Sequence, residues 1–102
     1  MLEKDIQLHI LKYLQGIGAM AGKSKTTGIY DAKRRCFRTD PYLFKGYPDL
    51  TIFWKKQLFF CEVKSGKNQQ SEEQRTFQRY CMEAGIIYIL AYSVDDVVSV
   101  IH

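Results

Sequence analysis

The sequence contains no pair of closely spaced cysteines. Its three cysteines, Cys36, Cys61 and Cys81, are far apart, and none belongs to a CxxC or CxxH motif. This spacing is unfavourable for a structural zinc site, and an odd number of cysteines does not suit a disulfide framework. Cys61 and Cys81 lie in apolar stretches, so we predict that they are core residues. We therefore expect the protein to work in a reducing compartment such as the cytoplasm.

Long apolar runs are also absent. No stretch approaches the roughly 20 apolar residues of a membrane-spanning helix, and the mixed polar and apolar N-terminus does not resemble a signal peptide. With 102 residues, of which 46% are hydrophobic, the chain has enough material for one hydrophobic core but not for two. We expect a single domain over residues 1–102 that does not associate with membranes.

Positive charge is missing from the C-terminal part of the chain. No Lys or Arg follows Arg79, although the formal net charge is +4. Basic residues instead gather in the segment 23–38, an uneven distribution that is common among nucleic-acid-binding proteins. A solvated basic loop without a ligand is the alternative interpretation. The candidate DNA-binding residues are Lys23, Lys25, Lys33, Arg34, Arg35 and Arg38.

The hydrophobic pattern predicts an α/β domain. Apolar residues recur at helical spacing in some segments, whereas alternating or continuous apolar runs predict strands in others. A helix between two of these strands can provide a right-handed crossover, so we expect a mixed sheet flanked by helices. The predicted elements are helices over residues 2–15, 72–83 and after Ser93, strands over residues 49–54, 57–64 and 86–92, a turn at Lys55-Lys56, and one or two short strands near residues 29–37.

The segment GIGAMAGKSKTT has the appearance of a phosphate-binding P-loop but does not match the motif. Its end, Gly22-Lys23-Ser24, fits the GxxxxGK[ST] pattern, whereas Ile17 stands where the first glycine is required. The preceding element is also predicted to be a helix, and the motif requires a strand. We therefore do not expect a nucleotide-binding loop here.

The two central strands carry charged residues that a plain apolar strand would not contain. Asp49 opens the first strand, and Glu62 and Lys64 share one face of the second because side chains alternate along a strand. If the two strands form a hairpin, these three side chains converge at one end of the sheet. Burying a charge is costly unless it is paired or bound to a metal ion. The pattern therefore predicts either a chemical role or a solvent-exposed position.

These residue types suit metal-dependent hydrolysis of a phosphodiester. Two carboxylates and a backbone carbonyl, from Cys61 or Val63, are the oxygen ligands that hard divalent cations bind. Such a cation polarises a phosphate oxygen and lowers the pKa of a bound water, and Lys64 could orient that water or stabilise developing charge. The alternative is an exposed ion pair between Glu62 and Lys64, with Asp49 as a turn residue.

Five sequence elements, taken in order, resemble the virus-type replication-repair nuclease (VRR-NUC) domain, a branch of the PD-(D/E)xK nuclease superfamily. They are Glu3 on the first helix, the segments GYPDL and CEVKSG, the helix EEQRTFQRYCMEAG and the strand IIYILAYS. The resemblance covers nearly the whole chain, although residues 19–45 carry no recognised motif. It implies an α/β fold with a restriction-endonuclease-like PD-(D/E)xK core, in which helices flank a mixed β-sheet.

The resemblance also implies roles for individual residues. Asp49 and Glu62 would be the main ligands of Mg²⁺ or Mn²⁺, and Lys64 would be the catalytic lysine. Glu3 would add a further carboxylate from the first helix, directly or through water. Gln74 would lie beside the site and orient Lys64 or a phosphate. The alternatives for this glutamine are Gln69, Gln70 and Gln78.

The implied activity is that of a metal-dependent endodeoxyribonuclease. Free-standing members of the family occur in phages and bacteria, so the resemblance implies a homodimer that cleaves Holliday-junction-like DNA, in DNA repair, inside a bacterial or phage-infected cell. The alternatives are a sequence- or flap-directed nuclease of the same fold, a non-catalytic DNA-binding module, and a structural subunit whose basic loop binds an acidic protein. Candidate dimer-interface residues, at least half of which have core packing as the alternative, are Tyr30, Phe37, Tyr42 and Phe44.

Overall fold

The protein folds around a four-stranded mixed β-sheet. The computed structural model describes residues 1–24, 29–31, 36–38, 42 and 44–102. The strand order is β1-β4-β5-β6, in which β4 is antiparallel to both β1 and β5, and β6 runs parallel to β5. The predicted α/β fold with a mixed sheet is confirmed. The strands span Met20–Lys23 (β1), Leu50–Trp54 (β4), Gln57–Val63 (β5) and Ile87–Ala91 (β6).

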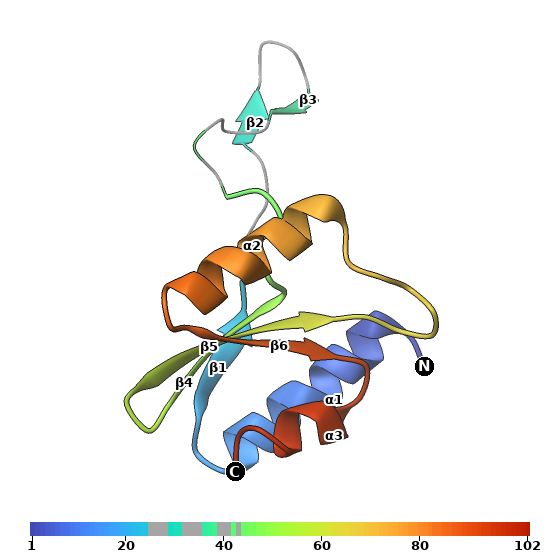
Figure 1. Ribbon diagram of the computed structural model, residues 1–102. Helices are drawn as coiled ribbons and strands as arrows, with labels where there is room; N and C mark the ends of the chain where they lie inside the picture. Colours follow the sequence, from blue (N-terminus) through green and yellow to red (C-terminus); the bar gives the residue numbers. More distant parts are fainter. Residues whose placement is uncertain (25–28, 32–35, 39–41, 43) are drawn as a thin grey trace.

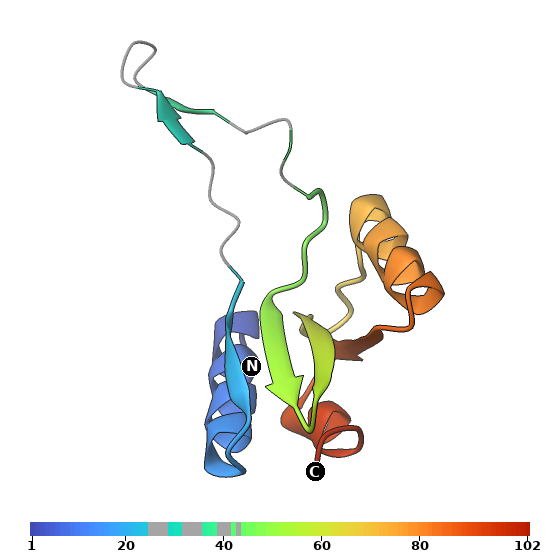
Figure 2. The ribbon, with the colours of Figure 1, turned by 90° about the vertical axis from the view of Figure 1, so that its left-hand side faces the viewer.

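A second, two-stranded sheet lies apart from the first. It pairs β2 (Ile29–Asp31) with β3 (Cys36–Arg38) in antiparallel register, with Tyr30 opposite Phe37. Two perpendicular views place these strands beyond the end of the main sheet at which β4 begins (Figures 1 and 2). The short strands predicted near residues 29–37 are therefore present.

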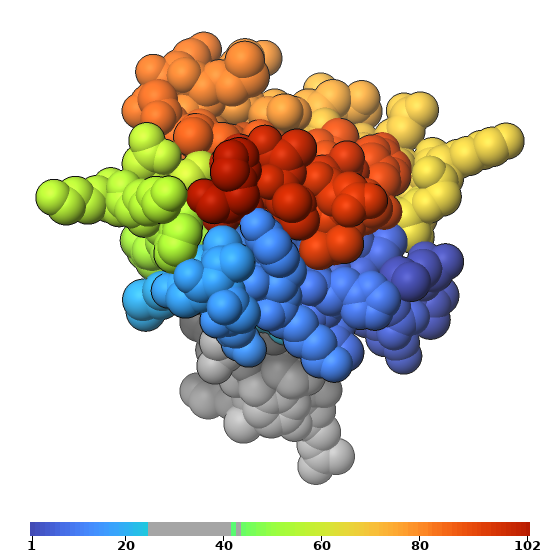
Figure 3. All heavy atoms as spheres, turned by 90° about the horizontal axis from the view of Figure 1, so that it is seen from below, coloured from blue at the N-terminus to red at the C-terminus, as the bar shows by residue number. Residues whose placement is uncertain are grey.

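Three helices cover the two faces of the main sheet. Helices α1 (Glu3–Gly16) and α3 (Val94–Val98) lie on one face, and α2 (Glu72–Glu83) lies on the other (Figure 1). A view onto the first face shows α1 and α3 side by side (Figure 3). Helix α2 connects the parallel strands β5 and β6, which is the crossover that parallel strands require. Within the described ranges, no helix has the length and apolarity to cross a bilayer.

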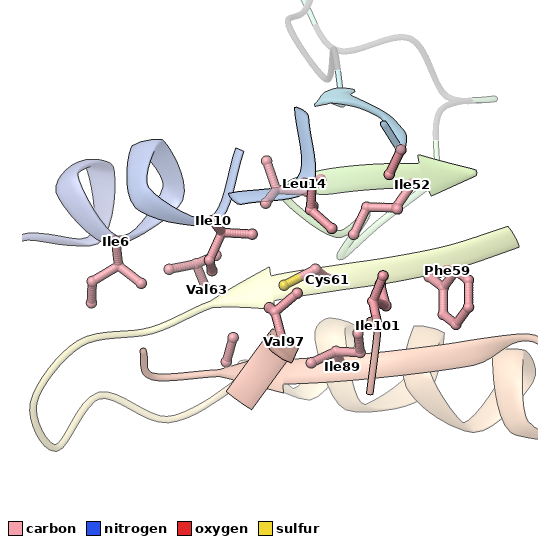
Figure 4. Close-up of a cluster of buried hydrophobic side chains, with 13 residues drawn as sticks. Ile6, Ile10, Leu14, Ile52, Phe59, Cys61, Val63, Ile89, Val97 and Ile101 are labelled. Carbon is pink, nitrogen blue, oxygen red and sulfur yellow. The ribbon is translucent and has the colours of Figure 1, made fainter. Parts of the chain in front are cut away.

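The hydrophobic core lies between the main sheet and the pair of helices α1 and α3 (Figure 4). One face of α1 is buried against the sheet through Ile6, Ile10 and Leu14. Side chains alternate along a strand, so every second residue of β5 enters the same core. These residues of β5 are Phe59, Cys61 and Val63. The next residue of the same strand therefore faces α2 instead.

The turn between β4 and β5 sets the register on which the site depends. Lys55 and Lys56 form this turn with φ values of 49° and 66°, as a two-residue hairpin turn of type I′ requires. Lysine is an unusual residue at positive φ, but the Lys55 ammonium lies 5.4 Å from the centroid of the Trp54 ring, a favourable cation–π contact. At the other end of the hairpin, Leu50 pairs with Cys61. The predicted turn is confirmed.

Candidate active site

Strand alternation places one acidic residue of β5 on the sheet face opposite the core. Glu62 lies between the core residues Cys61 and Val63 in sequence, so its side chain is on the α2 side. Only 2% of its surface is exposed, and it is the one buried charged residue in the described part of the chain. A buried carboxylate needs a partner, because removing its charge from water is costly.

Asp49 is the first neighbour of Glu62. It directly precedes β4, and the pairing of Leu50 with Cys61 brings it level with the end of β5. The backbone N–H of Val63 donates to Asp49 Oδ2 over 2.9 Å. On the other side, the backbone N–H of Ser24 donates to the carbonyl of Asp49 over 2.8 Å. Asp49 is thus held from both neighbouring strands, and the structure brings it together with Glu62 at one end of the sheet.

Gln74, in the first turn of α2, is the second neighbour. Its Nε2 donates to Glu62 Oε1 over 2.5 Å. Its Oε1 accepts from the backbone N–H of Ser71 over 2.8 Å, and its own backbone N–H donates to Ser71 Oγ over 3.2 Å. This reciprocal pair is a capping box, in which Ser71 is the N-cap of the helix. Because the amide oxygen is occupied by Ser71, the amide NH₂ group is directed at Glu62.

The second oxygen of the Glu62 carboxyl group, Oε2, is buried, and no hydrogen-bond donor from the described residues reaches it. Burial raises the pKa of Glu62 to about 8, and the negative charge of Asp49 and a hydrogen bond to it add to the rise. The positive charge of Lys64 acts in the opposite direction. Two carboxyl groups this close repel each other when both are ionised. A divalent cation would remove that repulsion, so this donor set fits a metal ion.

The backbone of β5 offers two carbonyl groups near these carboxylates, and their positions differ. In a strand, the N–H and C=O of one residue point toward the same neighbouring strand. Cys61 stands opposite Leu50 within the β4–β5 ladder, so its carbonyl takes part in strand pairing. Val63 lies beyond the last pair of this ladder, with its N–H directed at Asp49. The carbonyl of Val63 is therefore the better candidate ligand of the two.

The side chains of Cys61 and Cys81 are not ligands of this site. Cys61 and Cys81 are buried and free, as predicted. Burial, followed by the negative charges of Asp49 and Glu62, raises the pKa of the Cys61 thiol to about 12. A thiol with such a pKa stays protonated at neutral pH and is a poor metal ligand.

Lys64 follows the last residue of β5 on the same side of the sheet as Glu62. Its backbone N–H donates to the carbonyl of Ala91 in β6 over 3.0 Å, which holds the end of the strand in place. Its side chain is half-buried, and its charge acts on Glu62. The structure therefore brings Asp49, Glu62, Lys64 and Gln74 together at one end of the sheet, and their roles in metal binding and catalysis stay predictions.

Glu3 is placed differently. It begins α1, which packs on the opposite face of the sheet, and it is half-buried. No group of three or more His, Cys, Asp or Glu side chains in the described ranges is close enough to hold a metal ion. Glu3 therefore does not complete a three-carboxylate cluster with Asp49 and Glu62. Its role through a bridging water stays a prediction.

Most of the predicted DNA-binding residues cannot be placed against the site. Lys23 is exposed at the end of β1 and pairs with Leu50, so it lies at the same end of the sheet as the carboxylates. Arg38 is in β3, but its side chain is outside the described part of the structure. The predicted DNA-binding residues that lie entirely outside the described part of the chain are Lys25, Lys33, Arg34 and Arg35.

An aromatic groove lies under α2, on the same face of β5 as Glu62. The rings of Tyr47, Phe60 and Phe77 contact one another edge to face, with centroids 5.2 to 5.4 Å apart. Phe44 extends this cluster toward solvent, with its ring centroid 5.8 Å from those of Tyr47 and Phe77. The groove beside these rings has a volume of about 570 Å³. Sequence reasoning assigned no role to Phe60, although alternation along β5 could have placed it on the same face as Glu62.

The structure also places one of the alternative glutamines and two of the candidate interface residues. Gln70 donates to the hydroxyl of Tyr88 over 3.1 Å, so it is occupied away from the carboxylates, and Gln74 is the glutamine that contacts Glu62. Among the candidate interface residues, Tyr42 and Phe44 are exposed. The side chains of Tyr30 and Phe37 lie outside the described part of the structure.

The sequence profile of the VRR-NUC domain family matches residues 27–95, which include Asp49, Glu62, Lys64 and Gln74 but not Glu3. The chain belongs to the VRR-NUC domain family. A solved VRR_NUC domain superimposes with a TM-score of 0.70 at 17% identity, covering 98% of this chain and 97% of that one. No curated protein matches the chain.

A second solved structure is Hjc from Archaeoglobus fulgidus, a Holliday junction resolvase of an archaeal hyperthermophile. It superimposes with a TM-score of 0.58 at 16% identity, covering 88% of this chain and 67% of that one. At these identities, the two likenesses show the fold, which is restriction-endonuclease-like. With the family match, they make the chain a nuclease domain of the PD-(D/E)xK superfamily.

Proposed function

We propose that this VRR-NUC domain is an endodeoxyribonuclease that depends on Mg²⁺ or Mn²⁺ and cleaves branched, Holliday-junction-like DNA as a homodimer. The observation that carries the proposal is the pair of carboxyl groups at the end of the sheet, of which that of Glu62 is buried. Glu62 Oε2 has no donor among the described residues and lies next to Asp49, in a chain of a nuclease family. A hard divalent cation is the ligand that best satisfies such a pair.

Asp49, Glu62 and the carbonyl of Val63 would hold the cation, with the carbonyl of Cys61 as the alternative third ligand. A bound cation polarises a phosphate oxygen and lowers the pKa of a coordinated water. Gln74 leaves only one oxygen of Glu62 free, since its amide occupies Oε1. The metal is therefore expected to meet Glu62 through Oε2 alone.

Other groups of the protein would orient the metal ligands and stabilise the charge that develops on the phosphate. The N–H of Val63 fixes one oxygen of Asp49 and so sets the direction of its second oxygen. Lys64, whose charge acts on Glu62, would stabilise negative charge that develops on the phosphate during attack. Glu3 would act through a water molecule at the edge of the site.

Branched DNA is proposed as the substrate because the similar solved structure Hjc is a Holliday junction resolvase. A homodimer would place two active sites about a two-fold axis, which suits paired cuts in a four-way junction. Basic residues of the segment 23–38, with Lys23 at the active-site end of the sheet, would contact phosphates. If they neutralise about six phosphates, log affinity should fall with log salt with a slope of roughly −5. A slope near zero would contradict this part of the proposal.

Two other functions fit the same fold. A sequence- or flap-directed nuclease would use the same residues on a different substrate. A non-catalytic DNA-binding module would bind DNA without cutting it, but the paired carboxyl groups with Lys64 beside them disfavour that alternative, because such a module has no need for them. The proposed setting is the cytoplasm of a bacterial or phage-infected cell, in DNA repair.

The test is cleavage of an end-labelled four-way junction and of linear duplexes with the same arm sequences, in Mg²⁺, in Mn²⁺ and in chelator. The variant Lys64→Ala removes the proposed catalytic lysine, and Lys12→Ala removes an exposed lysine of α1 as a matched control. We expect metal-dependent cutting of the junction alone, lost in Lys64→Ala and kept in Lys12→Ala. Equal cutting of all substrates would remove the junction preference. Binding of DNA without cutting under any metal would favour the non-catalytic module.

The homodimer has its own test. Light scattering of the purified protein at micromolar concentration should give twice the monomer mass of 11.9 kDa. A monomeric mass, both free and with junction DNA bound, would exclude paired cutting by a stable dimer.

A further inference from the structure

Gly46 makes an unusually close backbone contact with the first turn of α2. A Cβ atom at this position would meet the carbonyl carbon and oxygen of Glu73 at 2.4 and 2.5 Å and the backbone nitrogen of Gln74 at 2.6 Å. All three are backbone atoms, so they cannot be moved aside by a side-chain rotation. Gly46 also has a φ of +69°, which favours glycine. Only a residue without a side chain allows this approach.

The two segments that meet at Gly46 carry the two halves of the active site. Three residues after Gly46 comes Asp49, and the contacted nitrogen of Gln74 belongs to the residue whose amide holds Glu62. The same nitrogen donates to Ser71 Oγ in the capping box. A shift of this turn therefore moves the amide that fixes the direction of Glu62.

The aromatic cluster holds the same two segments together but does not set their spacing. Tyr47, the residue after Gly46, contacts Phe77 of α2 with ring centroids 5.2 Å apart. Rings in edge-to-face contact tolerate a range of separations. The backbone contact at Gly46 is much less tolerant, because any added atom there forces the two segments apart.

We propose that Gly46 is a positioning residue of the nuclease site: its backbone contact with Glu73 and Gln74 sets the distance between the Asp49 loop and α2, and so keeps the Gln74 amide on Glu62. The inference rests on the proposed function in so far as the site binds a metal ion. With a Cβ at residue 46, the first turn of α2 must retreat by about 1 Å to reach ordinary contact distance. A retreat of this size lengthens the 2.5 Å hydrogen bond to about 3.5 Å, beyond the usual range, and so weakens it strongly.

The test compares Gly46→Ala with Gly85→Ala. Gly85 follows α2, has a nearly equal φ of +74°, and has open space where a Cβ would be added. Both variants carry the same backbone strain, and only Gly46→Ala adds the contact with α2. We expect both to lower the melting temperature through that strain, and Gly46→Ala to lower it further because it also displaces the first turn of α2. Only Gly46→Ala is expected to weaken Mn²⁺ binding, by about tenfold or more, and to slow cleavage by roughly 100-fold.

The contact between Gln74 and Glu62 can also be measured without metal or DNA. The side-chain NH₂ resonances of Gln74, assigned from the signals missing in Gln74→Met, report its contact with Glu62 in the metal-free protein. These resonances should move toward the positions of solvent-exposed glutamines in Gly46→Ala and stay unchanged in Gly85→Ala. Equal Mn²⁺ affinities and unchanged Gln74 resonances in folded Gly46→Ala would overturn the proposal.

The role of Gly46 can still be tested if Gly46→Ala does not fold or if the wild type shows no activity. If Gly46→Ala does not fold, Ser71→Ala removes the bond from the Gln74 nitrogen without adding an atom, and the same loss of Mn²⁺ affinity is expected. An unchanged affinity in that variant would overturn the proposal. If the wild type neither binds Mn²⁺ nor cuts DNA, the proposed function fails by itself. The metal-free Gln74 resonances then decide the role of Gly46 alone.

Discussion

The two faces of strand β5 differ in what they bury. Toward α1 and α3 the strand presents Phe59, Cys61 and Val63, which are packed in a continuous apolar core. Toward α2 it presents Phe60 and then Glu62, the one buried charged residue in the described part of the chain. The two faces alternate residue by residue, so stability and chemistry are encoded in the same seven-residue strand.

On the side facing α2, the residues of β5 change from apolar to charged along the strand. Phe60 lies in the aromatic cluster with Tyr47 and Phe77, and Glu62 follows it toward the end of the sheet. Burial of this carboxyl group, followed by the charge of Asp49, raises its pKa. The site is therefore built where an apolar face ends, and substitutions on the two faces should have separable effects.

The largest expected effect is on the α2 face. Asp49→Asn keeps the shape of the side chain and an oxygen that accepts from the Val63 N–H, but it removes one of the two charges that would hold a cation. We predict that cleavage falls by about 1000-fold or more, while the melting temperature in chelator stays equal or rises because the repulsion of Glu62 is removed. Labelled-junction cleavage and thermal unfolding measure the two quantities. Wild-type cleavage by Asp49→Asn would show that the site lies elsewhere.

The core face should show the reverse pattern. Ile10 is fully buried between α1 and the sheet, so Ile10→Ala leaves a cavity. We predict a loss of about 3–4 kcal/mol in the free energy of unfolding, with cleavage per folded molecule within about twofold of wild type. Urea unfolding and cleavage at low temperature measure this pair. A loss of cleavage larger than the loss of folded protein would mean that the two faces are coupled.

The pH dependence of stability should come from the α2 face. The pKa of Glu62 is about 8 in the folded, metal-free protein, against an ordinary value of 4.5. Between these values the folded chain binds more protons than the unfolded chain, so stability falls as pH rises from about 5 through 8. The loss is at most about 5 kcal/mol. Glu62→Gln should flatten this dependence, as should saturating Mn²⁺; a wild-type slope retained in Glu62→Gln would contradict the assignment.

The smallest effect, on the free energy of unfolding, should come from the aromatic cluster under α2. Phe77→Leu removes a ring that contacts Tyr47, Phe60 and Phe44. We predict a destabilisation of roughly 1–2 kcal/mol. Phe53→Leu, on the half-exposed part of the same sheet face, is the matched control and should cost less. Equal costs for both variants would show that the aromatic cluster has no special role in holding α2.

Much of this arrangement follows from local rules. Alternation along residues 57–64 predicts that Glu62 and Lys64 share a face, and the short turn at Lys55-Lys56 predicts the hairpin that brings Asp49 to them. Both inferences need only the period of a strand and the length of a turn. The Ser71–Gln74 capping box has an equally local signature, S-x-x-Q.

Other features depend on tertiary packing and could not be predicted. Strand β1 has the sequence MAGK, with a glycine and a mostly exposed pattern, so no strand period is visible in it. It forms because β4 offers a free edge. The position of Glu3 depends on how α1 packs on the far face of the sheet. The contact at Gly46 likewise exists only once α2 is docked.

The measurement that tests the central claim most directly is calorimetric titration of Mn²⁺ into the metal-free protein at pH 7, in two buffers of different ionisation enthalpy. Metal binding ionises a carboxyl group that holds a proton, so the wild type should release nearly one proton per Mn²⁺. Glu62→Gln should bind much more weakly and release none. Wild-type affinity and proton release in Glu62→Gln would contradict the claim that Asp49 and Glu62 form the metal site of this nuclease domain.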